Sequence, residues 1–177
     1  RKGQQKNPLR VLELFSGIGS GTIALKRLEI PCEVIHVDHD PIANEVCKFN
    51  HNGDGIKHVY IDTFEEIYGK GSDPDDAMVR KLVTDHGPID LVLAGAPCQE
   101  YSGLNANRDA NSENAQYLPN VGKLIEKLNE VQMNSFDVQH EVLFLSENVV
   151  FKERDAINAC YGGLSPFELD AADLGPC

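Results

Sequence analysis

Residues 10–28 read Arg10-Val11-Leu12-Glu13-Leu14-Phe15-Ser16-Gly17-Ile18-Gly19-Ser20-Gly21-Thr22-Ile23-Ala24-Leu25-Lys26-Arg27-Leu28, and this stretch decides the fold. Its first third is a strand-like run, and apolar positions 24, 25 and 28 have helical spacing. The glycines between them let the backbone approach a ligand closely and supply amide donors near a helix start. Strand, glycine turn and helix are the first unit of a nucleotide-binding sheet; a tight turn that needs only backbone freedom is the alternative. The spacing G-x-G-x-G is one residue shorter than the dinucleotide fingerprint, which disfavours NAD.

Further strand-like and helix-like runs alternate along the chain. Strands are predicted at 32–38, 57–61, 89–94 and 141–146, a sixth around 166–169, and helices at 22–28, 41–49, 77–83 and 118–131. This alternation predicts an α/β fold with a doubly wound, mostly parallel, Rossmann-like sheet. Ligands bind at the carboxyl ends of the strands in such sheets.

Acidic residues end the second and third predicted strands. Asp38 lies about 20 residues after the glycine turn, where a carboxylate can bind ribose hydroxyls, although it could instead cap the next helix. Asp62, followed by Thr63, could reach an adenine amino group or cap the turn that follows. Together they favour a cofactor with hydroxyl and amino donors.

The fourth and fifth predicted strands end in reactive side chains. The segment Gly95-Ala96-Pro97-Cys98-Gln99 follows an apolar run, and Glu147 follows the fifth strand. A thiol and a carboxylate on one rim suggest covalent catalysis assisted by a general acid. The alternatives are a buried structural cysteine and a helix-capping glutamate. Since no histidine adjoins Cys98, His58 and His140 are the distant candidates for a partner.

Five features follow one another along the chain. They are Phe15-Ser16-Gly17-Ile18-Gly19, Asp38, Asp62, Gly95-Ala96-Pro97-Cys98-Gln99 and Glu147-Asn148-Val149. In this order they resemble the DNA cytosine methyltransferases that modify carbon-5, over nearly the whole chain. Residues 25–30 and 87–92 are similar to the eukaryotic de novo branch. Because Pro-Cys-Gln also occurs in related transfer-RNA cytosine methyltransferases, DNA is the favoured substrate and RNA the alternative.

The resemblance implies S-adenosyl-L-methionine as cofactor and S-adenosyl-L-homocysteine as product. Phe15 would stack on the adenine, Asp38 would bind the ribose, and Asp62 would hold the adenine amino group. The cofactor-binding residues implied are Phe15, Ser16, Gly17, Ile18, Gly19, Asp38, His39, Asp62, Thr63 and Pro97.

The resemblance also implies the chemistry. The Cys98 thiolate would attack carbon-6 of a flipped-out cytosine, so that carbon-5 becomes nucleophilic enough to take the methyl group. Glu147 would donate a hydrogen bond or proton to ring nitrogen-3. The substrate-binding residues expected are Gln99, Ser102 and Asn148, of which Asn148 is better explained as structural.

Residues 1–177 are expected to form one truncated methyltransferase catalytic domain. Members of the family continue with a base-contacting arginine, a target-recognition region and a late segment that completes the cofactor pocket. A missing segment or a partner chain is therefore expected to supply the rest, and the isolated chain should show little turnover. The rival interpretations are a catalytically silent regulatory subunit and an NAD-dependent α/β enzyme.

Charge and cysteine usage restrict partners and compartment. The formal net charge of −12 disfavours DNA binding by bulk electrostatics. The five cysteines show no C-x-x-C spacing, so no metal site is expected. With no signal peptide or membrane-length apolar run, the predicted location is intracellular: the nucleus in a eukaryote, the cytoplasm in a bacterium. The polar stretch 101–116 is expected to be disordered or to close over a flipped base.

Overall fold

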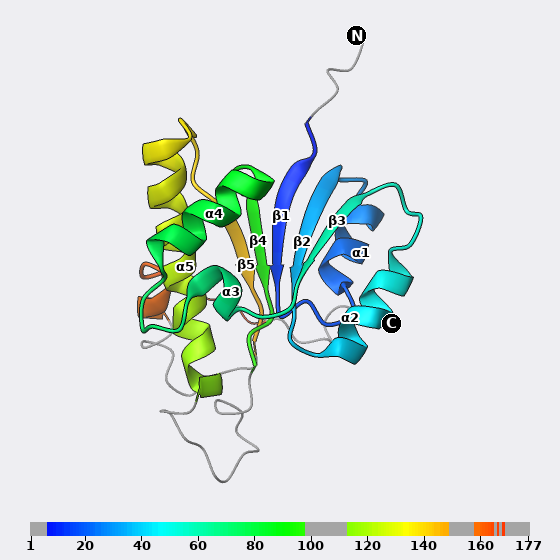
Figure 1. Ribbon diagram of the computed structural model, residues 1–177, viewed down its shortest axis with the longest axis horizontal. Coiled ribbons are helices and arrows are strands. Elements are labelled where there is room, and N and C mark those ends of the chain that lie inside the picture. The colour runs from blue at the N-terminus through cyan, green and yellow to red at the C-terminus, as the bar shows by residue number, and fades with distance from the viewer. Residues whose placement is uncertain (1–6, 98–112, 149–157, 165, 167, 169–177) are drawn as a thin grey trace.

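The computed structural model describes residues 7–97, 113–148, 158–164, 166 and 168, and in this part five strands form one parallel sheet (Figure 1). In chain order the elements are β1 (Leu9–Leu14), α1 (Ser20–Arg27), β2 (Cys32–Val37), α2 (Pro41–Asn50), β3 (Lys57–Ile61), α3 (Glu65–Tyr68), α4 (Asp76–His86), β4 (Leu91–Ala94), α5 (Glu113–Ser135) and β5 (Leu143–Ser146). The predicted α/β sheet is confirmed. Of the predicted sixth strand, the two residues that the structure describes, Pro166 and Glu168, are in no strand.

The strand order is β3-β2-β1-β4-β5, with every neighbouring pair parallel. The chain therefore builds outward from β1 to β3, then crosses to the other side of β1 for β4 and β5. This reversal creates a topological switch point between β1 and β4, where doubly wound sheets bind ligands beyond the strand ends.

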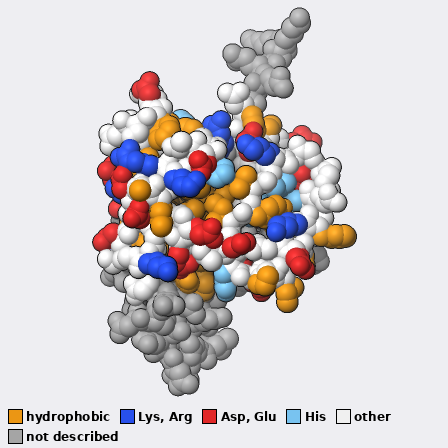
Figure 2. Space-filling model, viewed as in Figure 1, with side chains coloured by type: hydrophobic (Ala, Val, Ile, Leu, Met, Phe, Trp, Pro, Cys, Tyr) orange, Lys and Arg blue, Asp and Glu red, His pale blue; other side chains and the backbone are white. Residues whose placement is uncertain are grey.

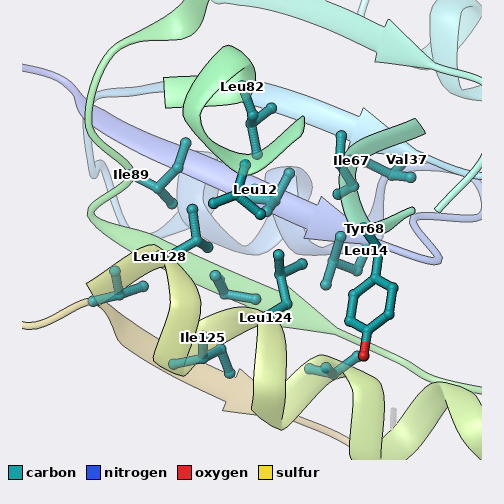
Figure 3. Packing of buried hydrophobic residues seen from close by; sticks show 14 of the residues in the cluster. Leu12, Leu14, Val37, Ile67, Tyr68, Leu82, Ile89, Leu124, Ile125 and Leu128 are labelled. Carbon is teal, nitrogen blue, oxygen red and sulfur yellow. The ribbon is translucent and has the colours of Figure 1, made fainter. Parts of the chain in front are cut away.

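One face of the sheet carries the larger hydrophobic core. Since side chains alternate along a strand, Leu12 and Leu14 of β1 point to this face, where α3, α4 and α5 pack (Figures 1 and 3). The predicted apolar stripe of α5 is confirmed as core, with these residues buried: Val121, Leu124, Ile125 and Leu128. In Figure 2, hydrophobic side chains gather in the middle of the viewed face, surrounded by acidic and basic ones.

The opposite face, under α1 and α2, is partly polar. Its apolar cluster of buried residues is small: Val11, Leu25, Cys32 and Val34. The stripe predicted for α1 is wrong at positions 24 and 28, because Ala24 and Leu28 are exposed while Thr22 and Leu25 are buried. The cause lies in β1: the Glu13 carboxylate accepts hydrogen bonds from the Gly21 N–H (2.8 Å) and the Thr22 hydroxyl (2.9 Å). These bonds fix which side of α1 faces the sheet.

Several element boundaries differ from those predicted, among them the starts of β4, β5 and α5. β4 begins at Leu91 because the Ile89 N–H and carbonyl both bind the buried Gln132 side chain of α5, at 2.6 and 3.1 Å. β5 begins at Leu143, two residues late. α5 begins at Glu113, so the end of the predicted polar loop is helical.

Among the described residues, none of the helices combines the length and the apolar character needed to span a bilayer.

Candidate cofactor and catalytic site

The carboxyl ends of the five parallel strands lie at one rim of the sheet, as the sequence predicts (Figure 1). The residues that directly follow the strands there are Phe15, Asp38, Asp62, Gly95 and Glu147. Cys98, Gln99 and Ser102 lie outside the described residues. The rim therefore brings together the predicted cofactor residues and Glu147, and the place of the thiol stays a prediction.

The glycine turn after β1 has an unusual backbone. Phe15, Gly17 and Gly19 have φ values of 54°, 53° and 81°, in the left-handed region. A β-carbon on Gly19 would clash with Nε2 of buried His51, whereas one on Gly17 would meet no heavy atom within 4 Å. Gly19 is thus required by its neighbours, and Gly17 faces open space. The Ser16 hydroxyl beside it is buried and has no hydrogen-bond partner in the part of the chain that the structure describes.

Asp38 holds this turn in place. Its Oδ2 accepts a 2.7 Å hydrogen bond from the Gly17 N–H, and its Oδ1 accepts one of 2.9 Å from the Asp40 N–H. Asp40, not Asp38, caps α2, because its carboxylate accepts from the N–H groups of Ile42 and Ala43. The helix-cap alternative for Asp38 is therefore wrong. A carboxylate has about four acceptor positions, so Asp38 keeps capacity for ligand hydroxyls.

Glu13 stabilises the same turn from the α1–α2 side of the sheet, a role that the sequence analysis did not predict. Besides Gly21 and Thr22, its carboxylate contacts Nδ1 of buried His36 at 3.2 Å. Burial opposes ionisation, but the hydrogen bond and charge of His36 outweigh it and lower the pKa of Glu13. A charged residue inside an otherwise apolar strand was the available signal.

An aromatic group surrounds Phe15. Its half-buried ring stacks on Phe64, with centroids 5.6 Å apart, and meets Tyr117 of α5 edge-on at 5.1 Å. The Tyr117 hydroxyl donates to Glu65 Oε1 at 3.1 Å. Phe64, Glu65 and Tyr117 were not predicted as site residues. Tyr117 lies about 100 residues after this turn, so no local pattern links the two.

The remaining predicted adenine-side residues are more open. Asp62 is exposed, and the N–H and hydroxyl of Thr63 bind Glu66 Oε1 at 3.0 and 3.2 Å, which makes a local turn. The His39 side chain is 82% exposed, with Nδ1 4.0 Å from Asp38 Oδ1. The Ile18 carbonyl accepts from Asn50 of α2 at 3.2 Å.

Glu147 lies against the turn that leads to Cys98. The Glu147 N–H donates to the Ala94 carbonyl at 2.8 Å, and its Oε2 lies 3.9 Å from where a β-carbon on Gly95 would be. The Asn148 side chain donates to the Ala96 carbonyl at 2.9 Å, which is a structural role. Pro97 is half-buried. The exposed carboxylate of Glu147 therefore lies beside Gly95, three residues before the cysteine.

The two histidines considered as distant partners do not lie at this rim. His140 is exposed and 3.6 Å from Asp90, which precedes the amino end of β4. His58 is the second residue of β3 and contacts His36 and Asp54 on the α1–α2 side.

A parallel sheet with this strand order and an aspartate-clamped glycine turn defines an α/β domain of Rossmann type. A model of the C-5 cytosine-specific DNA methylase family matches residues 9–149, and the chain belongs to that family.

Curated relatives include enzymes that act on DNA and on transfer RNA. The chain is 31% identical over 107 residues to DNA (cytosine-5)-methyltransferase DRM1 of Arabidopsis thaliana, a match covering 56% of this chain and 15% of that protein. It is 28% identical over 127 residues to the human tRNA (cytosine(38)-C(5))-methyltransferase, covering 70% and 28%. The Schizosaccharomyces pombe enzyme of the same name is 28% identical over 153 residues, covering 86% and 39%. The chain thus spans less than half the length of each of these relatives.

Solved structures support the fold alone. The Entamoeba histolytica methyltransferase EhMeth superimposes with a TM-score of 0.58 at 20% identity, over 89% of this chain and 43% of that one. A short-chain dehydrogenase/reductase from Sinorhizobium meliloti gives 0.57 at 14% identity, over 90% and 70%. Since these proteins have different chemistry, the fold by itself does not choose between methyl and hydride transfer.

Proposed function

We propose that this chain is the cofactor-binding and catalytic part of an enzyme that transfers a methyl group from S-adenosyl-L-methionine to carbon-5 of cytosine in DNA. The observation that carries the proposal is the Glu147 carboxylate beside the Gly95 turn, at the rim where Asp38 clamps the glycine turn. Family membership selects the chemistry for this arrangement.

The rim fits the cofactor. The open space at Gly17, the spare acceptor positions of Asp38 and the Ser16 hydroxyl, which has no partner among the described residues, match a ligand with hydroxyl and amino donors. Acidic side chains at three strand ends, Asp38, Asp62 and Glu147, also favour a cationic ligand. S-adenosyl-L-methionine supplies an electrophilic methyl group on a sulfonium.

The residues then divide the reaction between them. The Cys98 thiolate adds to carbon-6 of the cytosine, and Glu147 offsets the charge that develops at ring nitrogen-3. After methyl transfer, loss of the carbon-5 proton to a base and elimination of the thiolate restore the aromatic ring and free Cys98. The base is not assigned to a residue of this chain.

Cofactor binding is tested by calorimetric titration with S-adenosyl-L-methionine and, separately, with NAD. Asp38→Ala should weaken S-adenosyl-L-methionine binding by about 1.5–3 kcal/mol, the range for hydrogen bonds to a charged group. Asp40→Ala is the matched control, since Asp40 caps α2 without touching the glycine turn. Binding of NAD in place of S-adenosyl-L-methionine, or equal affinity in the Asp38 variant, would refute the cofactor assignment.

The chemistry is tested in the natural gene product that contains this chain. An oligonucleotide containing 5-fluorocytosine should trap it covalently, because fluorine blocks the final loss of a proton from carbon-5. Cys98→Ser should abolish the adduct, and Glu147→Gln should slow its formation. Absence of an adduct would favour the silent-subunit interpretation.

RNA is the second candidate substrate, favoured by the larger share of this chain that the transfer-RNA methyltransferases match. Parallel trapping with 5-fluorocytosine in DNA and in transfer RNA separates the two. A DNA adduct is expected; trapping by RNA alone would reassign the substrate.

A further inference from the structure

A buried group of histidines and carboxylates lies on the α1–α2 side of the sheet, away from the catalytic rim. Three of its members come from one short segment, His51-Asn52-Gly53-Asp54-Gly55-Ile56-Lys57-His58, which joins α2 to β3. His51 is fully buried, and the side chains of Asp54 and His58 are only 7% and 9% exposed. One nitrogen or oxygen of each of the three lies within 4.8 Å of the others.

The spacing of these atoms suits a metal ion better than a strong ion pair. Nδ1 of His51 lies 3.3 Å from Asp54 Oδ2, and Nε2 of His58 lies 3.2 Å from Asp54 Oδ1. Charge-assisted N–H···O⁻ bonds are shorter, at about 2.7–2.9 Å. Two ligands held about 2.0 Å from a tetrahedral zinc ion lie about 3.3 Å apart.

The outward-facing nitrogens of both histidines contact other polar groups. Nε2 of His51 lies 3.2 Å from the Gly19 carbonyl. Nδ1 of His58 lies 2.9 Å from Nε2 of His36, whose own Nδ1 contacts the Glu13 carboxylate at 3.2 Å. The Gly19 carbonyl behind His51 orients that ring and favours a proton on its outer nitrogen, whereas His58 is linked to the Glu13 carboxylate only through His36.

We propose that His51, Asp54 and His58 form a binding site for one divalent transition-metal ion, and that zinc fits its two imidazoles and one carboxylate best. Three protein ligands leave a fourth position for water. Because His51 binds the Gly19 carbonyl, the ion would brace the glycine turn from the side opposite the cofactor rim. C-x-x-C spacing does not predict this site, since the donor set contains no cysteine.

Lys26 provides a direct competitor for the ion. Its Nζ lies 3.1 Å from Asp54 Oδ2, and its side chain is about one-third exposed, 36%. Binding of a cation must displace this ammonium group. Removing the charge should therefore tighten metal binding, an effect opposite to that expected of a lysine that merely stabilises the fold.

The test is titration of the purified, metal-stripped chain, without cofactor, with Zn²⁺ by calorimetry and with Co²⁺ by visible absorption. One ion per chain should bind, and the cobalt spectrum should be tetrahedral without a thiolate charge-transfer band. Because His58→Gln removes a ligand, it should weaken zinc binding by more than the loss of about 10–100-fold that is typical when only a hydrogen-bond partner of a ligand is removed. His140→Gln, an exposed histidine elsewhere, should leave the affinity unchanged.

Lys26→Gln keeps the proposal testable if the His58 variant does not fold. It should raise zinc affinity about two- to fivefold, the equivalent of one partly exposed ion pair. A thiolate band, a stoichiometry insensitive to His58→Gln in a folded variant, or unchanged affinity in Lys26→Gln would each overturn the proposal. None of these readings depends on whether the chain binds S-adenosyl-L-methionine.

Discussion

Gly17 and Gly19 lie two residues apart in the same turn, both with positive φ, yet their surroundings differ sharply. A β-carbon at Gly19 would clash with His51 Nε2 and lie 2.8 Å from Cys47 Sγ, both on buried side chains. A β-carbon at Gly17 would have no heavy atom within 4 Å. The pair therefore separates the cost of backbone conformation from the cost of steric conflict.

The expected magnitudes follow from these two terms. A non-glycine residue in the left-handed region costs about 1–2 kcal/mol, and this applies to both Gly17→Ala and Gly19→Ala. The Gly19 variant must also displace His51 from the Gly19 carbonyl, which adds about 1–3 kcal/mol for the unmade hydrogen bond. Gly19→Ala should thus destabilise the chain by about 2–5 kcal/mol, and Gly17→Ala by about 1–2.

Urea unfolding followed by circular dichroism measures both changes, and cofactor titration adds a second readout. A methyl group at Gly17 would protrude into the open space of the proposed cofactor site, so Gly17→Ala should lose S-adenosyl-L-methionine affinity despite its small effect on stability. Equal destabilisation by the two substitutions would refute the steric argument. Unchanged cofactor affinity in a folded Gly17→Ala variant would show that the open space is not the binding site.

Two further predictions concern the core and the thiols. Gln132→Leu leaves the buried N–H and carbonyl of Ile89 unpaired and should lower the free energy of unfolding in urea by about 2–5 kcal/mol. Met133→Leu, on the exposed side of α5, should be near neutral. Equal effects would contradict the stabilising role of the Gln132–Ile89 hydrogen bonds. Burial raises the pKa of Cys47 to about 11, so at pH 8 only about one part in a thousand is thiolate. Iodoacetamide should therefore label Cys47 only on unfolding, whereas the half-buried Cys160 should react in the folded protein. Peptide mass spectrometry measures both labelling rates. Equal rates in the folded protein would contradict the burial of Cys47.

Features encoded locally could be predicted from the sequence. The apolar runs at 32–37 and 57–61 and the stripe of α5 each carry their own periodicity, so strand and helix type were predicted correctly. The rim followed from the same reasoning, because parallel strands place their carboxyl ends together. The spacing from the glycine turn to Asp38 predicted a ribose-binding carboxylate, which stays a prediction; the 2.7 Å bond from the Gly17 N–H to Asp38 was not predicted.

Features that depend on distant partners could not be predicted. The start of β4 is set by Gln132, which lies 43 residues beyond Ile89. The buried side of α1 is set by Glu13 rather than by the helix's own apolar residues. In both cases a polar side chain satisfies backbone groups from another element, and no local pattern records that bond.

The glycine turn at the catalytic rim depends on contacts with the polar, α1–α2 side of the sheet. On this side a small apolar cluster shares the space beneath α1 and α2 with ionisable groups, whereas the other side is packed with aliphatic and aromatic residues. Two backbone groups near the glycine turn are held from this polar side: the Gly21 N–H donates to Glu13, and His51 contacts the Gly19 carbonyl. A change in either contact therefore acts on backbone atoms two to four residues after Gly17. Variants of His51, Asp54 and His58 should for this reason change cofactor affinity even though none of these three residues directly follows a strand at the rim.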